Sequence, residues 1–252
     1  MIKIAMFRPE GKSIEYSIED VEVINIPVTK IVDTNIDILN FLKSIGPVDY
    51  LIFTSTLAAQ KFRRSVHDQF DPYLKQAKEV IAIGAETAKA ISSKVSVVPP
   101  LQSTAGIAEY LKSKSGSALL VRSRQGNPVL VQKLSSHMSV YVLNIYSSQQ
   151  LAPDQRHMDF SREIANKHVD ALIFTSSMIT TSFYNIFSGL DSKLVEHLAE
   201  VIKIAIGKET ENTMISLNLV PDHTLSKPEI LKAIKIVKDI CSKRECNKFM
   251  KK

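Results

Sequence analysis

The sequence predicts an α/β protein made of two similar lobes, each a mostly parallel sheet flanked by helices. One observation behind this prediction is the alternation of strand and helix patterns, which is typical of parallel sheets with helices on both faces. A second is an internal duplication, because three segments recur in the same order at a nearly constant spacing. The length of 252 residues suits one or two domains, and each lobe is long enough to bury its own core.

The longest repeated segment begins with aspartate and contains Leu-Ile-Phe-Thr-Ser. It runs from Asp49 to Phe62 and again from Asp170 to Phe183, with seven of fourteen positions identical. In each copy Leu-Ile-Phe predicts a buried parallel strand, and the pattern after Thr-Ser predicts a helix. Serine and threonine are good N-cap residues, and the candidates are Ser55 or Thr56 and Ser176 or Ser177.

Two shorter segments are also repeated. Ile81–Thr87 recurs as Ile204–Thr210, with six of seven positions identical, and Val98-Pro99 recurs as Val220-Pro221. The three pairs lie 121 to 123 residues apart, so chance is a poor explanation and we infer a duplicated α/β plan.

The remaining elements follow from local patterns. Strands are predicted where short apolar or alternating runs meet turn residues, at 2–7, 21–28, 50–54, 79–83, 95–98, 118–122, 140–146, 169–174 and 201–206. Helices are predicted where apolar residues recur at helical spacing, at 56–70, 104–114, 127–136, 154–167, 177–187, 208–216, in a short stretch after Gly84 and from Lys227 onward. A further helix passes through Leu42 and ends at Gly46-Pro47, and Thr34 is its expected N-cap.

The chain can be divided in two ways. A simple cut near residue 116 gives two contiguous halves. Alternatively, the N-terminal strands join the second half in one discontinuous lobe, and the first repeat is inserted as the other lobe. In that case the chain crosses between lobes near 24–31 and 143–148. The pattern of the sequence fits both divisions.

Composition and charge exclude several classes of protein. The apolar fraction of 44% and the charged fraction of 23% are ordinary for a soluble domain, and no apolar run reaches the ~18 residues of a membrane span. Cys241 and Cys246 form no disulfide framework, so we expect a reducing cytoplasm. The net charge of +6 fits nucleic acid or an anionic small molecule, but no nucleic-acid-binding motif accompanies it. Much of the excess lies in the last ten residues, where a solvated helix end is the simpler interpretation.

Helix starts at the ends of the repeated strands are the candidate binding groups. Helix N-termini carry unpaired N–H groups and a positive dipole end, and ligands of open α/β sheets lie at the carboxyl ends of strands. We therefore expect a cleft for an anion, although the same residues serve equally well as turns and caps. Its expected lining consists of the main-chain amides of Ser55, Thr87, Ser176 and Thr210, with Arg8 and Arg122 as charge partners or as solvated strand ends.

Catalytic motifs are scarce in this sequence. It contains no P-loop, no nucleophile elbow and no dinucleotide fingerprint. The six histidines lie in polar settings and are expected at the surface, and no spacing of His, Cys and carboxylates predicts a metal site. Tyr146 ends the apolar strand Val142–Tyr146, and from this pattern alone a half-buried packing role is favoured.

Several motifs together resemble the uroporphyrinogen-III synthase family over essentially the whole chain. They are Phe-Thr-Ser, Ala-Ile-Gly-Xaa-Xaa-Thr, Val-Xaa-Xaa-Xaa-Tyr at mid-chain and Pro-Xaa-Xaa-Thr before the last helix. The resemblance implies a bilobal fold joined by two antiparallel linker strands. It favours the discontinuous division, with 1–27 and 149–252 in lobe 1, 32–143 in lobe 2, and linkers at 28–31 and 144–148.

The resemblance also implies an activity. The expected enzyme is a cytoplasmic, monomeric lyase of heme biosynthesis that needs no cofactor, no nucleic acid and no membrane. Its substrate is hydroxymethylbilane, a linear tetrapyrrole with eight carboxylates, which loses water and closes with ring D inverted to give uroporphyrinogen III. The rival hypothesis is a non-catalytic bilobal module that binds an anionic metabolite.

Individual residues match the family unevenly. Tyr146 matches the tyrosine that is the family's candidate general acid, and Thr210 matches the threonine of Ile-Gly-Xaa-Xaa-Thr. The asparagine frequent after Phe-Thr-Ser is replaced by Leu57 and Met178, and the usual proline after Ile-Gly is replaced by Ala85 and Lys208. These departures bear on single contacts rather than on the family.

Overall fold

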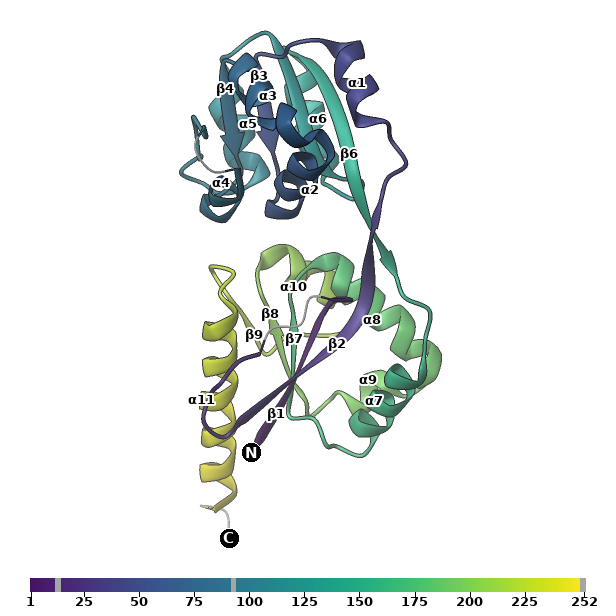
Figure 1. Ribbon diagram of the computed structural model, residues 1–252. Coiled ribbons are helices and arrows are strands. Elements are labelled where there is room, and N and C mark those ends of the chain that lie inside the picture. The colour runs from purple at the N-terminus through teal and green to yellow at the C-terminus, as the bar shows by residue number, and fades with distance from the viewer. Residues whose placement is uncertain (12–14, 92–93, 250–252) are drawn as a thin grey trace. The chain divides into compact units, whose positions relative to one another are not determined.

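The computed structural model describes residues 1–11, 15–91 and 94–249, with side chains as far as 243 (Figure 1). The chain forms two compact units. Unit 1 contains residues 1–31 and 149–252, and unit 2 contains residues 32–148. The mixed α/β fold with mostly parallel sheets flanked by helices is confirmed. Within the described ranges, no helix is both long enough and apolar enough to cross a membrane.

Unit 1 contains a sheet in the order β2-β1-β7-β8-β9, and the neighbouring strands pair in parallel. Its strands are β1 (Ile2–Pro9), β2 (Val21–Asp33), β7 (Ala171–Phe174), β8 (Ile202–Ala205) and β9 (His223–Thr224). Its helices are α7 (Gln155–Ala165), α8 (Ser177–Leu190), α9 (Leu194–His197), α10 (Lys208–Ser216) and α11 (Ile230–Phe249).

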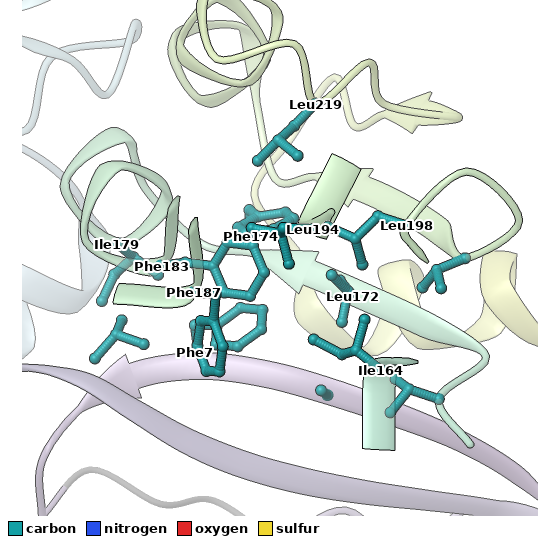
Figure 2. Close-up of a cluster of buried hydrophobic side chains, with 14 of the residues drawn as sticks. Phe7, Ile164, Leu172, Phe174, Ile179, Phe183, Phe187, Leu194, Leu198 and Leu219 are labelled. Atoms are coloured by element: carbon teal, nitrogen blue, oxygen red, sulfur yellow. The ribbon is translucent and has the colours of Figure 1, made fainter. Parts of the chain in front are cut away.

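Strand β1 places alternate side chains on the two faces of this sheet. Ala5 and Phe7 pack with α7 and α8, whereas Ile4 and Met6 pack with α11. On the first face, four phenylalanine rings from β1, β7 and α8 lie together (Figure 2). The ring centroid of Phe183 is 4.5 Å from that of Phe7, so unit 1 has an aromatic core directly beside its first strand.

Unit 2 contains strands in the order β4-β3-β5-β6, again in parallel pairs. They are β3 (Tyr50–Phe53), β4 (Glu79–Ala82), β5 (Ser117–Ser123) and β6 (Ser139–Gln150), the last of which ends in unit 1. The helices are α1 (Ile38–Ile45), α2 (Thr56–Val66), α3 (Phe70–Gln76), α4 (Ala85–Ile91), α5 (Thr104–Leu111) and α6 (Pro128–Ser135), with a 3₁₀ turn η1 (His67–Gln69). One face of the sheet packs on α5 and α6 through Ile107 and Leu130. Phe62 of α2 packs on Phe53 of β3.

Three predicted elements differ from the structure. The helix predicted at 56–70 breaks after Val66, because His67 has φ of +45° and its N–H donates to the Arg63 carbonyl. The strand predicted at 95–98 is only a single bridge between Ile81 and Val97, because the following prolines cannot extend a ladder.

The third correction concerns the cap of α1. Asp37, not Thr34, is the N-cap, and its carboxylate accepts from the Asn40 amide. The Thr34 hydroxyl instead donates to the Asn144 carbonyl at 2.6 Å. This contact spans 110 residues and leaves no local trace in the sequence.

Candidate functional site

Each unit has a switch point, where the order of its strands reverses. In unit 2 it lies between β3 and β5, and in unit 1 it lies between β1 and β7. Ligands of open α/β sheets bind outside the carboxyl ends of strands at such points. Ser55 and Arg122 lie at the carboxyl ends of β3 and β5, and Ser176 and Arg8 lie at those of β7 and β1. The fold therefore places an equivalent serine and arginine at both switch points.

The repeated Thr-Ser pair ties each strand end to its neighbours. The Thr54 hydroxyl donates to the carbonyl of β5 residue Val121, and the Thr175 hydroxyl donates to the carbonyl of β1 residue Phe7 at 3.2 Å. The serine after each threonine caps the next helix. Ser55 accepts from the Ala58 amide at 3.1 Å, and Ser176 accepts from the Ile179 amide at 3.3 Å. Both serine N-caps are confirmed.

The aspartate that opens each repeat also has a structural role. Asp170 accepts from the Lys3 amide at 2.8 Å, and Asp49 accepts from the Ser117 amide at 2.7 Å. Gly116 allows this approach in unit 2, since its φ is +120° and a side chain there would collide with Asp49. The Lys78 ammonium and then the Ser117 amide and hydroxyl lower the pKa of Asp49 from 3.8 to about 2.

Tyr146 lies near the carboxyl end of β6, where it pairs with Ser123 of β5. Its side chain is buried, with 8% of its surface exposed. The phenol oxygen is 3.2 Å from Ser55 Oγ. The structure thus joins the candidate acid to the N-cap of α2, although 91 residues separate them in sequence.

The threonines of Ile-Gly-Xaa-Xaa-Thr are buried in both units. Thr87 Oγ1 lies 3.5 Å from Thr56 Oγ1, which links α4 to α2. In unit 1 Thr210 is buried in α10, and the Ser177 hydroxyl donates to the Glu209 carbonyl at 3.1 Å. The Thr87 hydroxyl therefore contacts another protein hydroxyl, and Thr210 is buried as a residue.

The two helix starts after these glycines differ. The Ala85 amide of α4 donates to Gln102 Oε1 at 3.2 Å, and a side chain at Gly84 would collide with the same oxygen. Helix α10 begins at Lys208, and its N-cap, Gly207, supplies no capping side chain. A side chain thus satisfies one amide at the start of α4, whereas no side chain among the described residues caps α10. Gln102 has no sequence signal of its own.

The two arginines have different surroundings. Arg122 is buried, and it donates to the carbonyls of Ser123 at 3.2 Å and Asn127 at 3.0 Å. Burial lowers the pKa of this guanidinium. Arg8 is half-buried, and the contacts described for it are to neutral groups, the Tyr16 hydroxyl at 3.1 Å and the Met6 sulfur.

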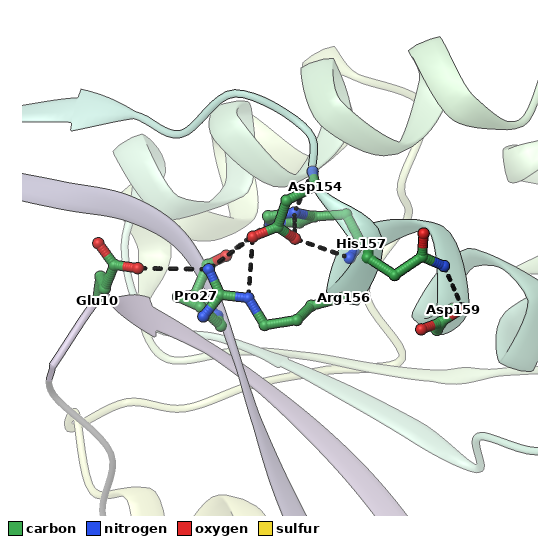
Figure 3. A network of polar contacts seen from close by, with 7 residues as sticks. Glu10, Pro27, Asp154, Arg156, His157 and Asp159 are labelled. Carbon is green, nitrogen blue, oxygen red and sulfur yellow. Dashed lines mark hydrogen bonds and ion pairs between the residues drawn. The ribbon is translucent and has the colours of Figure 1, made fainter.

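A polar network in unit 1 corrects the expectation that every histidine lies at the surface. His157 of α7 is completely buried, and its Nε2 donates to the Pro27 carbonyl of β2 at 2.8 Å (Figure 3). The Asp154 amide donates to its Nδ1 at 3.1 Å. Arg156 bridges the Asp154 and Glu10 carboxylates, and it is the main reason why the pKa of Asp154 falls to about 2. Within the described ranges, no cluster of His, Cys, Asp or Glu is placed to hold a metal ion.

Comparison with solved structures identifies this fold. A uroporphyrinogen III synthase mutant from the extremely thermophilic bacterium Thermus thermophilus matches with a TM-score of 0.65 and 15% identity, over 95% of this chain and 99% of that chain. The uroporphyrinogen-III synthetase of Helicobacter pylori matches with a TM-score of 0.62 and 17% identity, over 95% of this chain and 100% of that one. No curated protein sequence matches the chain significantly. The fold is therefore that of the solved uroporphyrinogen III synthases.

The sequence itself places the chain within a family. The family model of uroporphyrinogen-III synthase HemD matches residues 16–235, which is most of the chain. The chain belongs to the uroporphyrinogen-III synthase family. It is a lyase-type enzyme of heme biosynthesis, and the substrate class of its family is a small-molecule tetrapyrrole.

Proposed function

We propose that this chain converts hydroxymethylbilane into uroporphyrinogen III with Tyr146 as general acid. The observation that supports this role is the contact of its phenol with Ser55 at the N-terminus of α2. A phenol ordinarily holds its proton at neutral pH and can donate it to a departing hydroxyl. Tyr146 is also at the switch-point end of its sheet, where ligands of such folds bind.

The proposed reaction begins at the terminal hydroxymethyl group. Tyr146 gives its proton to the hydroxyl oxygen while the C–O bond breaks, and water leaves. The electron pair of the pyrrole nitrogen stabilises the carbon that has lost the hydroxyl. The substituted α-carbon of ring D then attacks this carbon, and the bond from that α-carbon to the methylene bridge of ring C breaks. The free α-carbon of ring D bonds to the released methylene, so the ring closes with ring D inverted. The proton lost from this α-carbon restores the phenol. The balance is one substrate to one product and one water.

For the substrate carboxylates we propose anion-binding groups within each unit, taken separately. Ser55, Ser176 and Thr210 lie at the starts of α2, α8 and α10, where main-chain amides and the helix dipole favour anions. Thr87 and Arg122 are the other two substrate-binding residues proposed in unit 2. Arg8 is the better charge partner of the two arginines, because its described contacts are neutral. The Arg122 guanidinium already donates to the carbonyls of Ser123 and Asn127, which follow it in the chain.

Salt dependence tests this binding proposal. Attraction between exposed charges is screened by salt, with a Debye length of about 30 Å at 0.01 M and about 3 Å at 1 M. We expect product affinity to fall as ionic strength rises. The same affinity at both salt concentrations would contradict the proposed charge partners.

We also propose that the units correspond to lobes 1–27 plus 149–252 and 32–143, with linker strands at 28–31 and 144–148. The observed boundaries after Ile31 and after Ser148 support this division. The enzyme is proposed to act as a cytoplasmic monomer without a cofactor. Sedimentation across a range of concentrations would test the oligomeric state.

The identity of the product tests the function. Hydroxymethylbilane closes without an enzyme to the type I isomer, so isomer analysis separates catalysis from the blank. We expect the type III isomer to dominate with this protein. A mixture no richer in type III than the blank would favour a module that binds the tetrapyrrole without catalysis.

A further inference from the structure

Among the described residues, Ser55 Oγ has two hydrogen-bond partners, which together constrain its proton. It accepts a hydrogen bond from the Ala58 amide at 3.1 Å and lies 3.2 Å from the Tyr146 phenol. A serine hydroxyl has one proton and two lone pairs. Because the amide can only donate, it occupies a lone pair of Ser55, and the proton of Ser55 remains available to Tyr146.

The direction of the second hydrogen bond matters for acid catalysis. If Tyr146 donated to Ser55, its proton would be held by the protein. If Ser55 donates to Tyr146, the phenol proton is free for a departing hydroxyl on the substrate. The same Ser55 proton then stabilises the phenolate that remains, because hydrogen bonds to charged acceptors are stronger than those to neutral ones.

The position of Ser55 adds a second electrostatic effect. Helix α2 runs from Thr56 to Val66, and Ser55 is its N-cap. A helix N-terminus favours negative charge, and the first turn of α2 contains no acidic side chain to oppose this effect. The phenol oxygen of Tyr146 therefore lies where the field of the helix favours the charge that proton donation creates.

We propose that Ser55 is a positioning residue for Tyr146, donating its proton to the phenol oxygen and linking it to the N-terminus of α2. This inference rests on the proposed function, in which Tyr146 is the general acid. It assigns the Ser55 side chain to the acid rather than to the substrate. The Ser55 main-chain amide remains available for a carboxylate.

The test compares two serine N-caps of unit 2. Ser103 caps α5 and accepts from the Gly106 amide at 3.2 Å, as Ser55 accepts from Ala58. Ser55→Ala and Ser103→Ala remove the same kind of cap, so similar decreases in thermal midpoint are expected. We expect kcat to fall about 10–100-fold in Ser55→Ala only, with KM nearly unchanged, because the lost bond is strongest in the charged state.

Two further variants separate positioning from stability. Ser55→Thr keeps the hydroxyl and should restore kcat to within about 3-fold of the wild type. In a Tyr146→Phe background, Ser55→Ala should cause little further loss, because the two residues act as a unit. A kcat loss in Ser55→Ala that equals that of Ser103→Ala, or that persists undiminished beside Tyr146→Phe, would overturn the inference.

The failure of this inference is distinguishable from failure of the proposed function. If the wild-type protein gives no excess of the type III isomer, the proposed function fails. If the wild type forms type III and Ser55→Ala retains full kcat, only the positioning role of Ser55 fails.

Discussion

Tyr146 in unit 2 and Thr29 in unit 1 occupy equivalent places in the two copies of the fold. Thr29 lies on β2 beside β1, and Tyr146 lies on β6 beside β5. Each follows a shift of register next to the arginine near the end of the neighbouring strand. Ser123 pairs with Tyr146 after that shift, and Pro9 pairs with Thr29. Thr29 is almost completely buried, and its hydroxyl has no hydrogen-bond partner among the described residues.

This comparison separates the hydrogen bonds that hold both units together from the contact of the proposed acid. Both copies keep the aspartate that accepts from a strand amide, the threonine that donates to a neighbouring strand and the serine N-cap. Each of these side chains has its hydrogen-bond partner within its own unit. Only unit 2 places a phenol beside the N-cap, as far as the described residues extend. We infer that duplication supplied two similar strand ends and that the proton donor belongs to one of them.

The largest expected effect concerns the phenylalanine that ends each repeat. Phe62 and Phe183 are fully buried, and each contacts three aromatic rings. Replacing either with alanine should cost about 3–5 kcal/mol of stability. Phe183→Ala should lie at the upper end, because its nearest ring centroid is 4.5 Å away, against 5.5 Å for Phe62.

Amide hydrogen exchange can measure the loss of stability in Phe62→Ala and Phe183→Ala separately for each unit. Phe183→Ala should reduce protection in β1 and β7, and Phe62→Ala should reduce it in β3 and β5. Equal loss of protection throughout the chain in both variants would contradict separate cores for the two units.

A smaller effect is expected at the third position of α7 and α1, the helices before each repeat. His157 is buried against the Pro27 carbonyl, whereas Asn40 is exposed and contacts its own N-cap. His157→Ala should cost about 2–4 kcal/mol, because it leaves a cavity and an unpaired carbonyl. Asn40→Ala should change stability by no more than about 0.5 kcal/mol, the usual range for surface substitutions. Denaturant melts of both variants would check this, and equal costs would contradict the buried role of His157.

The smallest of these effects concerns the opening aspartates. The pKa of Asp49 is lowered from 3.8 to about 2, so its carboxylate stabilises the fold above pH 3.8, and this contribution is lost as pH falls to about 2. At neutral pH Asp49→Asn should cost about 1–2 kcal/mol. Asp170→Asn removes one charged acceptor from the Lys3 amide and should cost less. Melts of both variants between pH 2 and 7 should show the deficit of Asp49→Asn shrinking toward pH 2. A constant deficit would contradict the assignment.

Most strands and both serine caps can be predicted because their signals are local. Leu-Ile-Phe fills a buried strand, and Ser55 and Ser176 bond to amides three residues ahead. The errors involve distant or rare conformations. The burial of His157 depends on Pro27, 130 residues away, and the break at His67 needs a positive φ that is uncommon outside glycine.

In the candidate site, too, features with a local sequence signal can be predicted, whereas contacts between distant residues cannot. Local pattern predicts Ser55 as a cap, and resemblance to the family singles out Tyr146. Their contact depends on the pairing of β5 with both β3 and β6, which no local pattern encodes.

The central claim is that the Tyr146 hydroxyl is the acid, and its removal tests it most directly. Tyr146→Phe keeps the ring, and Tyr141→Phe on the same strand is the matched control. With hydroxymethylbilane as substrate, kcat for type III product should fall about 10²–10⁴-fold in Tyr146→Phe and stay near wild type in Tyr141→Phe, with thermal midpoints unchanged. Full activity of Tyr146→Phe, with type III still dominant, would return Tyr146 to a packing role.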